Sequence, residues 1–117
     1  LRTLTVIKNA VENVQKTVGK YIDIDHVDYN DPAVLASIGT GRTDGVFQLE
    51  SGGMKNFMKE LKPKSLEDII AGISLYRPGP MDFIPQYIKG KNHPETITYD
   101  CPQLEPILAP TYHNIQE

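Results

Sequence analysis

One short segment of the sequence, LYRPGP, combines a single cation with residues that restrict the backbone on both sides of it. Arg77 precedes a proline, which disfavours the α conformation at Arg77. Pro78 and Pro80 fix their own φ angles, and Gly79 permits a tight turn. Because a guanidinium fork suits phosphate or carboxylate, the segment predicts a rigid turn that presents Arg77 to an anion. The alternative is an ion pair with a nearby acid such as Asp82.

A second group of candidate residues lies in the segment GVFQLES and in the residues just after it. Gln48, Glu50 and Ser51 are polar residues within an apolar turn, a pattern typical of a fixed hydrogen-bond network. Lys55 and Lys59 follow one helical turn apart and could face a polyanion, or they could form an ordinary solvated helix face.

Other kinds of chemistry are absent from the sequence. Asp23, Asp25 and Asp28 suggest a calcium loop, but such a loop needs an acid or amide at position 27 and glycine at position 28, where Val27 and Asp28 stand. There is no glycine-rich phosphate loop, no HExxH and no GxSxG. Cys101 is the single cysteine, which predicts a reduced thiol. We therefore expect no metal site and no self-sufficient catalytic site in these 117 residues.

Length and composition suit a single soluble unit. No apolar run approaches the ~20 residues that cross a bilayer, and no signal peptide precedes the first helix, so we expect a cytoplasmic protein with no membrane partner. The chain begins without methionine and ends at Gln116-Glu117, which predicts a fragment of a longer protein. A net charge of −3 argues against a free-standing DNA-binding protein, although residues 1–20 and 55–64 are locally basic.

The apolar periodicity predicts a mainly α fold with short extended segments near residues 22–24 and 97–99, and a strand or tight turn at residues 46–49. The first helix is predicted from a single apolar stripe, which we expect to lie in a core: Leu4, Ile7, Val11, Val14 and Val18. Gly19 is expected to terminate this helix, and Asp31-Pro32 to open the next. Further helices are expected at residues 32–38, 53–61, 66–76, 83–88 and 102–108, with a loop at 90–94.

The helix at 66–76 should support the arginine turn, and the helix before it also has a clear pattern. The helix at 53–61 carries one apolar face: Met54, Phe57, Met58 and Leu61. Ser65 opens a capping-box pattern, S-x-x-D, before the apolar run at 66–76. Since that run covers most of the helix circumference, we expect a deeply buried helix that holds Arg77 still.

Several of these motifs occur in the same order in one known family. GVFQLES followed by GM, then L-x-P-x-S-x-E-D-I-I-A, then LYRPGPMD, resembles the alpha subunits of bacterial DNA polymerase III, the C family of replicative polymerases. The start, LRTLTVI, is similar to the helix after that family's FDFLGL segment, and LEPILAPTY to its approach to a YQEQ motif. The resemblance implies that residues 1–21 are a helix leaving the palm domain and that residues 22–117 are the N-terminal part of the fingers domain.

The resemblance also implies a function for the longer protein. The family transfers nucleotides from a dNTP to a primer end on template DNA, using magnesium ions held by three palm aspartates. Those aspartates are expected before residue 1, so no catalytic residue is assigned here. The implied partners are primer–template DNA, dNTP and the other subunits of the polymerase assembly, including the sliding clamp. In this setting Arg77 is expected to contact phosphate or to lock the fingers to the palm. The resemblance likewise implies that Gln48, Glu50 and Ser51 help to position nucleotide or DNA phosphate, and that Lys55 and Lys59 face the DNA backbone.

The end of the chain departs from the family pattern. After Thr111-Tyr112 the family usually continues with glycine and then YQEQ, whereas this chain has residues 113–117 in a shorter sequence. Two other hypotheses remain open from the sequence. One is a small helical nucleic-acid-binding module with no enzymatic parent, and the other is a purely structural segment that holds fingers to palm.

Overall fold

The structure, a computed structural model, describes residues 1–112, and within them it is helical without a β-strand. The predicted mainly α fold is confirmed. The α-helices are α1 (Arg2–Val18), α2 (Pro32–Gly39), α3 (Gly52–Leu61), α4 (Leu66–Leu75), α5 (Ile84–Asn92) and α6 (Glu105–Leu108). Short 3₁₀ helices occur at Ile24–His26, Pro80–Phe83, Pro94–Thr96, Pro102–Leu104 and Ala109–Thr111. The expected extended segments pair into no sheet among these residues, and residues 46–49 form a tight turn.

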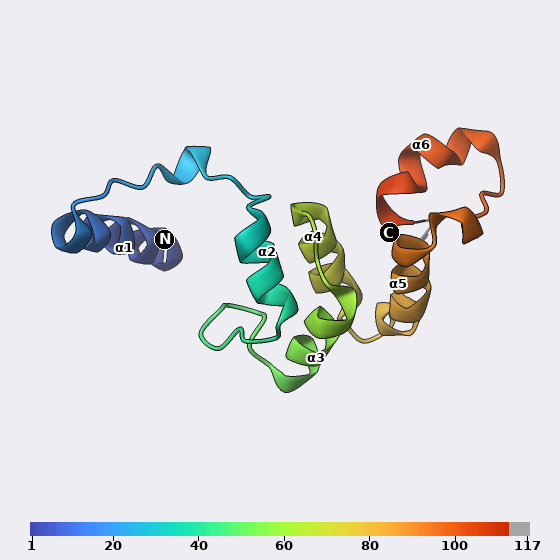
Figure 1. Ribbon diagram of the computed structural model, residues 1–117, viewed down its shortest axis with the longest axis horizontal. Helices are drawn as coiled ribbons and strands as arrows, with labels where there is room; N and C mark the ends of the chain where they lie inside the picture. The colour runs from blue at the N-terminus through green and yellow to red at the C-terminus, as the bar shows by residue number, and fades with distance from the viewer. Residues whose placement is uncertain (113–117) are drawn as a thin grey trace.

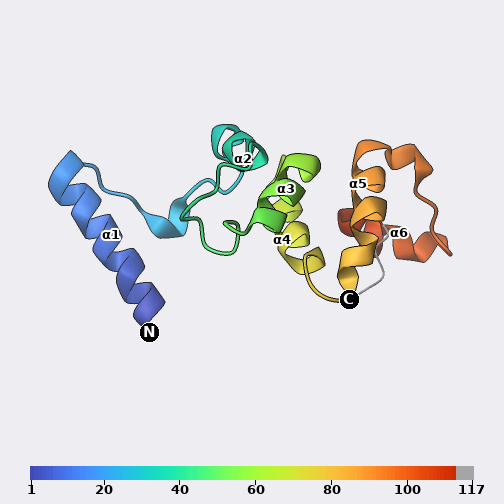
Figure 2. The same ribbon diagram turned by 90° about the horizontal axis from the view of Figure 1, so that it is seen from below.

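The molecule is elongated, with principal extents of 54 × 31 × 28 Å. Both views place α1 at one end, α2, α3 and α4 in the middle, and α5 with α6 at the other end (Figures 1 and 2). A long non-helical connection separates α1 from α2, interrupted by the 3₁₀ helix Ile24–His26. The arginine turn connects α4 to the 3₁₀ helix before α5, so it lies between the middle group and the far end.

The first helix ends as predicted but does not form a core. Gly19 adopts φ 71°, and its N–H donates to the carbonyl of Gln15 at 3.0 Å, which is a left-handed C-cap. However, α1 contains no buried residue, and Leu4 and Val18 are 62% and 72% exposed. The expectation of a buried stripe is therefore wrong for this chain. Three residues of the stripe, Leu4, Ile7 and Val11, line a groove between α1 and residues 21–25.

The core forms where α3 packs on α4. The predicted apolar face of α3 is buried, together with Leu49, Leu75 and Tyr87. Gly72 of α4 allows the close approach, because a Cβ added there would lie 2.8 Å from the Met58 Cε and 3.2 Å from the Leu61 Cδ2. The two helices therefore pack with little spare volume between them.

The helix α4 is less buried than its composition suggests. Only Asp68, Gly72 and Leu75 are buried in it, and Ile70 is exposed. The expectation of a deeply buried helix is wrong because, among the described residues, α4 is covered mainly on the side that faces α3 and the start of the next helical segment. The capping box is present, since Ser65 Oγ accepts from the Asp68 N–H at 3.3 Å. The expected loop at 90–94 is also corrected, because α5 continues to Asn92.

Candidate functional site

Backbone hydrogen bonds fix the arginine turn on both sides of Arg77. The Arg77 N–H donates to the carbonyl of Leu75 at 2.8 Å, and Tyr76 between them has φ −79° and ψ 65°, an inverse γ-turn. The Arg77 carbonyl then accepts from the Met81 N–H at 3.2 Å. Gly79 adopts φ 102°, a conformation that side-chain-bearing residues rarely take. No described atom lies within 4 Å of a Cβ built on Gly79, so a side chain would have room there. The turn therefore requires glycine for its backbone angle and not for lack of space.

The residue before Arg77 anchors the turn to α3. The ring of Tyr76 stacks on Phe57 with 6.1 Å between ring centroids and 17° between planes. The Tyr76 hydroxyl covers Gly53 so closely that a Cβ built there would lie 1.7 Å from it. The C-terminal end of α4 is thus held on the N-terminal end of α3, and Arg77 follows at once.

The Arg77 side chain is exposed. Within residues 1–112 it makes no hydrogen bond or ion pair, so the ion pair with Asp82 that the sequence left open is not formed there. An exposed guanidinium on a hydrogen-bonded turn remains available to an anion from outside these residues.

The segment GVFQLES forms a compact loop between α2 and α3. The Thr43 hydroxyl donates to the carbonyl of Leu49, and one carboxylate oxygen of Glu50 accepts from the Gly45 N–H at 3.3 Å. Ser51 is the N-cap of α3, accepting from the Met54 N–H at 3.2 Å. Glu50 and Ser51 therefore have local roles in folding the loop.

Gln48 in the same loop has φ 65°, which is uncommon for a residue with a side chain. The apolar residue before it, Phe47, is largely exposed. The loop thus exposes the side chains of Phe47 and Gln48, while the hydrogen bonds of Glu50 and Ser51 fix the loop backbone.

The two lysines of the candidate site have different surroundings. The Lys55 ammonium forms an ion pair with Asp44, and the Lys55 side chain is only 24% exposed. This hydrogen bond and the lysine's charge lower the pKa of Asp44 below its usual value of 3.8. Lys59 is exposed, and its stem lies against Gly41, where a built Cβ would be 2.5 Å from the Lys59 Cε.

The structure brings part of the predicted set together. Because Tyr76 lies on Gly53, the arginine turn sits at the same end of α3 as the Ser51 cap. Lys59 lies further along α3, toward its C-terminal end. The predicted residues therefore spread along α3 and its N-terminal loop.

A buried polar cluster was missed by the sequence reasoning. The Lys91 ammonium donates to the carbonyls of Leu61 and Lys62 at 2.6 and 2.7 Å and lies 3.4 Å from Asp68. The Tyr87 hydroxyl donates to the other oxygen of Asp68 at 3.2 Å. Lys91 lies 30 residues from Leu61, and the sequence offers no local signal for such a contact.

This cluster changes the acidity of two phenols. Burial, and then the negative charge of Asp68, raise the pKa of Tyr87 far above its usual 10.0. Burial followed by the same charge also raises the pKa of Tyr112, whose ring packs edge-on against Tyr87 at 5.1 Å. Tyr87 thus serves as a hydrogen-bonding group in its neutral form, and Tyr112 packs against its ring.

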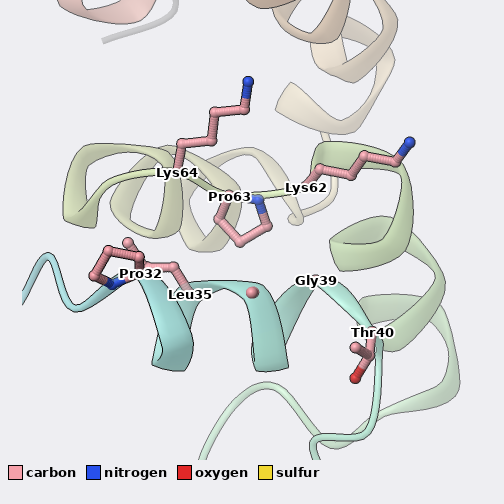
Figure 3. Close-up of a pocket in the computed structure, with 8 residues that line it drawn as sticks. Pro32, Leu35, Gly39, Thr40, Lys62, Pro63 and Lys64 are labelled. Atoms are coloured by element: carbon pink, nitrogen blue, oxygen red, sulfur yellow. The ribbon is translucent and has the colours of Figure 1, made fainter.

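A groove of about 430 Å³ separates α2 from the link between α3 and α4. Figure 3 shows Pro63 pointing toward α2, while Lys62 and Lys64 point away from it. The groove is mostly apolar, and the two charged residues that line it are Lys62 and Lys64. Within residues 1–112, no group of three or more His, Cys, Asp or Glu could hold a metal ion, and no helix there has the length and apolar character to cross a bilayer.

The sequence was compared with known proteins. A family described as the bacterial DNA polymerase III alpha subunit finger domain matches residues 3–116. DNA polymerase III subunit alpha of Halalkalibacterium halodurans is 49% identical over 112 residues, which cover 96% of this chain and 10% of that relative. The corresponding subunit of Staphylococcus aureus strain COL is 46% identical over the same share of both chains. The chain thus spans about one tenth of the length of these relatives, and it belongs to the finger-domain family of bacterial DNA polymerase III alpha subunits.

Proposed function

We propose that this chain is part of a DNA-directed DNA polymerase, in which it helps to position nucleotide or DNA phosphate by means of Arg77. The family membership supports the polymerase, and one observation supports the role of Arg77. Its guanidinium is exposed and unpaired within residues 1–112, yet its backbone is held by hydrogen bonds and by the anchored ring of Tyr76. A cation with so little backbone freedom loses little entropy when it binds phosphate.

We propose that the longer protein adds nucleotides from dNTP to a primer on template DNA during chromosome replication in the bacterial cytoplasm. Its partners would be the DNA and the other subunits of the polymerase assembly, including the sliding clamp. Phosphoryl transfer depends mainly on positioning and on stabilising charge, which is the contribution proposed for Arg77. Magnesium would be held in the palm of that protein by the aspartates that the family uses.

The other candidate residues support this function in different ways. Glu50 and Ser51 are proposed to hold the loop before α3, and Gln48 to stand at its surface. Lys59 is proposed as a DNA backbone contact, because its ammonium has no ion pair within residues 1–112. For Lys55 such a contact would require it to leave Asp44.

We also propose the division of the chain implied by the family, with residues 1–21 leaving the palm and residues 22–117 beginning the fingers. The exposed stripe of α1 supports a helix that packs outside these residues. The prediction about residues 113–117 lies outside the described residues.

The test is Arg77→Ala in the full-length polymerase, with single-nucleotide incorporation measured at several dNTP and DNA concentrations. We expect kcat/KM to fall by about tenfold or more, since a lost charge-assisted hydrogen bond costs about 1.5–3 kcal/mol. Arg2→Ala is the matched control, because it removes an equal charge from an exposed position on α1. Unchanged incorporation in Arg77→Ala would exclude the proposed role.

The 117-residue chain alone is proposed to be inactive, and a primer-extension assay checks this. A salt titration of its DNA binding distinguishes this proposal from the alternative hypothesis of an independent nucleic-acid-binding module. Tight binding that weakens steeply with salt would support such a module, whereas negligible binding supports a part of a polymerase.

A further inference from the structure

We propose that Lys91 is a positioning residue for Arg77. Its ammonium joins the C-terminal end of α3 to the N-terminal end of α4 and so sets the angle between these helices. This angle in turn sets the position of the arginine turn at the end of α4. This inference rests on the proposed function of Arg77.

The contacts of Lys91 link separate elements through one buried group. Its ammonium, on α5, donates to the carbonyls of Leu61 and Lys62 at the end of α3 and pairs with Asp68 on α4. The side chains of Lys91 and Asp68 are only 7% and 6% exposed. An ammonium has three donors, and here three oxygen atoms from two other elements surround it.

The position of the ammonium follows from the ending of α3. Lys62 caps α3 in a left-handed conformation, at φ 48°. The last carbonyls of a helix lack intrahelical partners and carry partial negative charge, so a cation is favourable there. Lys91 supplies this cation from a distant part of the chain.

The Asp68 carboxylate also accepts hydrogen bonds from groups other than Lys91. Its carboxylate accepts from the Lys64 N–H at 2.9 Å and from the Tyr87 hydroxyl at 3.2 Å. Taking an ion pair out of water is costly, and the fully hydrogen-bonded arrangement makes the geometry at the start of α4 specific.

The pair α3–α4 is thereby held at both ends. Lys91 holds one end, Tyr76 on Phe57 and Gly53 holds the other, and Gly72 sets the close packing between them. A ten-residue helix is about 15 Å long, so a change of about 10° in the tilt of α4 shifts one of its ends by roughly 2–3 Å relative to the other. Misplacement by about 1 Å can reduce an enzymatic rate by about a hundredfold.

The experiment is a double-mutant cycle in the full-length polymerase. Lys91→Met removes the charge while keeping an unbranched stem, Arg77→Ala removes the proposed phosphate contact, and the double variant combines them. For each protein, kcat and KM are measured for single-nucleotide incorporation. Lys89→Met is the matched control, because it removes the same charge from an exposed position on the same helix.

We expect Lys91→Met to lower kcat/KM by about tenfold, changing the same kinetic parameter as Arg77→Ala. Lys91→Arg should recover most of the activity, because it keeps the charge and the donors. The double variant should lie within about twofold of Arg77→Ala alone, since a positioning residue has no effect once the positioned group is gone. Lys89→Met should be near wild type.

Two results overturn the inference while leaving the proposed function intact. One is normal activity in Lys91→Met. The other is a double variant whose loss in kcat/KM equals the product of the losses in the two single variants. If Arg77→Ala itself is silent, the proposed role of Arg77 fails, and the positioning role of Lys91 fails with it. If Lys91→Met does not fold, Lys91→Gln is measured in its place by the same criteria.

Discussion

The phenol of Tyr76 lies directly over the backbone of Gly53, so that a Cβ built on this glycine would come within 1.7 Å of the hydroxyl oxygen. This contact ties the residue before Arg77 to the first turn of α3. It depends on the absence of a side chain at position 53, because even a methyl group would displace the ring. The position of the arginine turn thus rests on a glycine in a different helix.

Gly53→Ala should therefore displace Tyr76 and weaken its stacking on Phe57. We expect a loss of about 1–2 kcal/mol in the free energy of unfolding, although alanine is intrinsically the better helix former. Gly52→Ala is the control, since no described atom lies within 4 Å of its built Cβ. Urea denaturation of the chain followed by circular dichroism measures both. Equal stabilities for the two variants would show that the contact at Gly53 is easily relieved.

Met58 should be the most costly methionine to truncate. Its side chain is fully buried at 0% exposure and fills the space between α3 and Gly72. Met58→Ala is expected to lower the free energy of unfolding by about 2–5 kcal/mol, from lost burial plus the cavity left behind. Met81→Ala, at an exposed position, should cost less than about 1 kcal/mol. A cost at position 58 as small as at position 81 would contradict the observed core.

The ion pair between Asp44 and Lys55 should make loop stability depend on acid pH. The pKa of Asp44 is lowered in the folded chain, so its contribution is present above the unfolded value of 3.8 and is lost as pH falls through the folded pKa. Asp44→Asn should thus destabilise the chain at pH 7 and have no such effect at about pH 2. Asp82→Asn serves as the control at an exposed position. If the stability difference between Asp44→Asn and wild type is the same at about pH 2 as at pH 7, it does not arise from the Asp44 charge.

The same substitution should release Lys55 for nucleic acid. In the full-length polymerase, Asp44→Asn is expected to steepen the salt dependence of DNA binding, because one more cation can then meet a phosphate. Binding measured across a range of salt concentrations tests this. An unchanged slope would mean that removing the Asp44 charge adds no DNA contact by Lys55.

Tyr87 should make the fold sensitive to alkaline pH. Its pKa is raised in the folded chain, so above the ordinary value of 10.0 the unfolded state loses this proton first and stability falls as pH rises. Tyr87→Phe is expected to cost about 1 kcal/mol at neutral pH, from the lost hydrogen bond to Asp68. Its stability should then fall less than that of wild type from about pH 9 to about pH 11.

Tyr21→Phe, at an exposed position, is the control for this alkaline effect. It should follow the wild-type pH dependence. Identical pH profiles for Tyr87→Phe and wild type would show that the buried phenol ionises without unfolding the chain.

Much of the secondary structure was predictable because its signals are local. Gly19, Asp31 and Ser65 each cap the helix end that the sequence indicates, through bonds to residues a few positions away. The apolar face of α3 follows from helical spacing alone and is buried as expected. The family was also evident from sequence, because its motifs are long, ordered and collinear.

The sequence by itself determined the helices, their caps and the family of this protein. Only the tertiary structure decided that the α1 stripe is exposed, that Lys55 is paired with Asp44, and that Arg77 has no partner among residues 1–112. The same holds for Lys91, whose ammonium meets carbonyls 29 and 30 residues away. Helix periodicity and capping involve neighbours within about one turn, whereas burial and ion pairing depend on which distant segments the folded chain brings into contact.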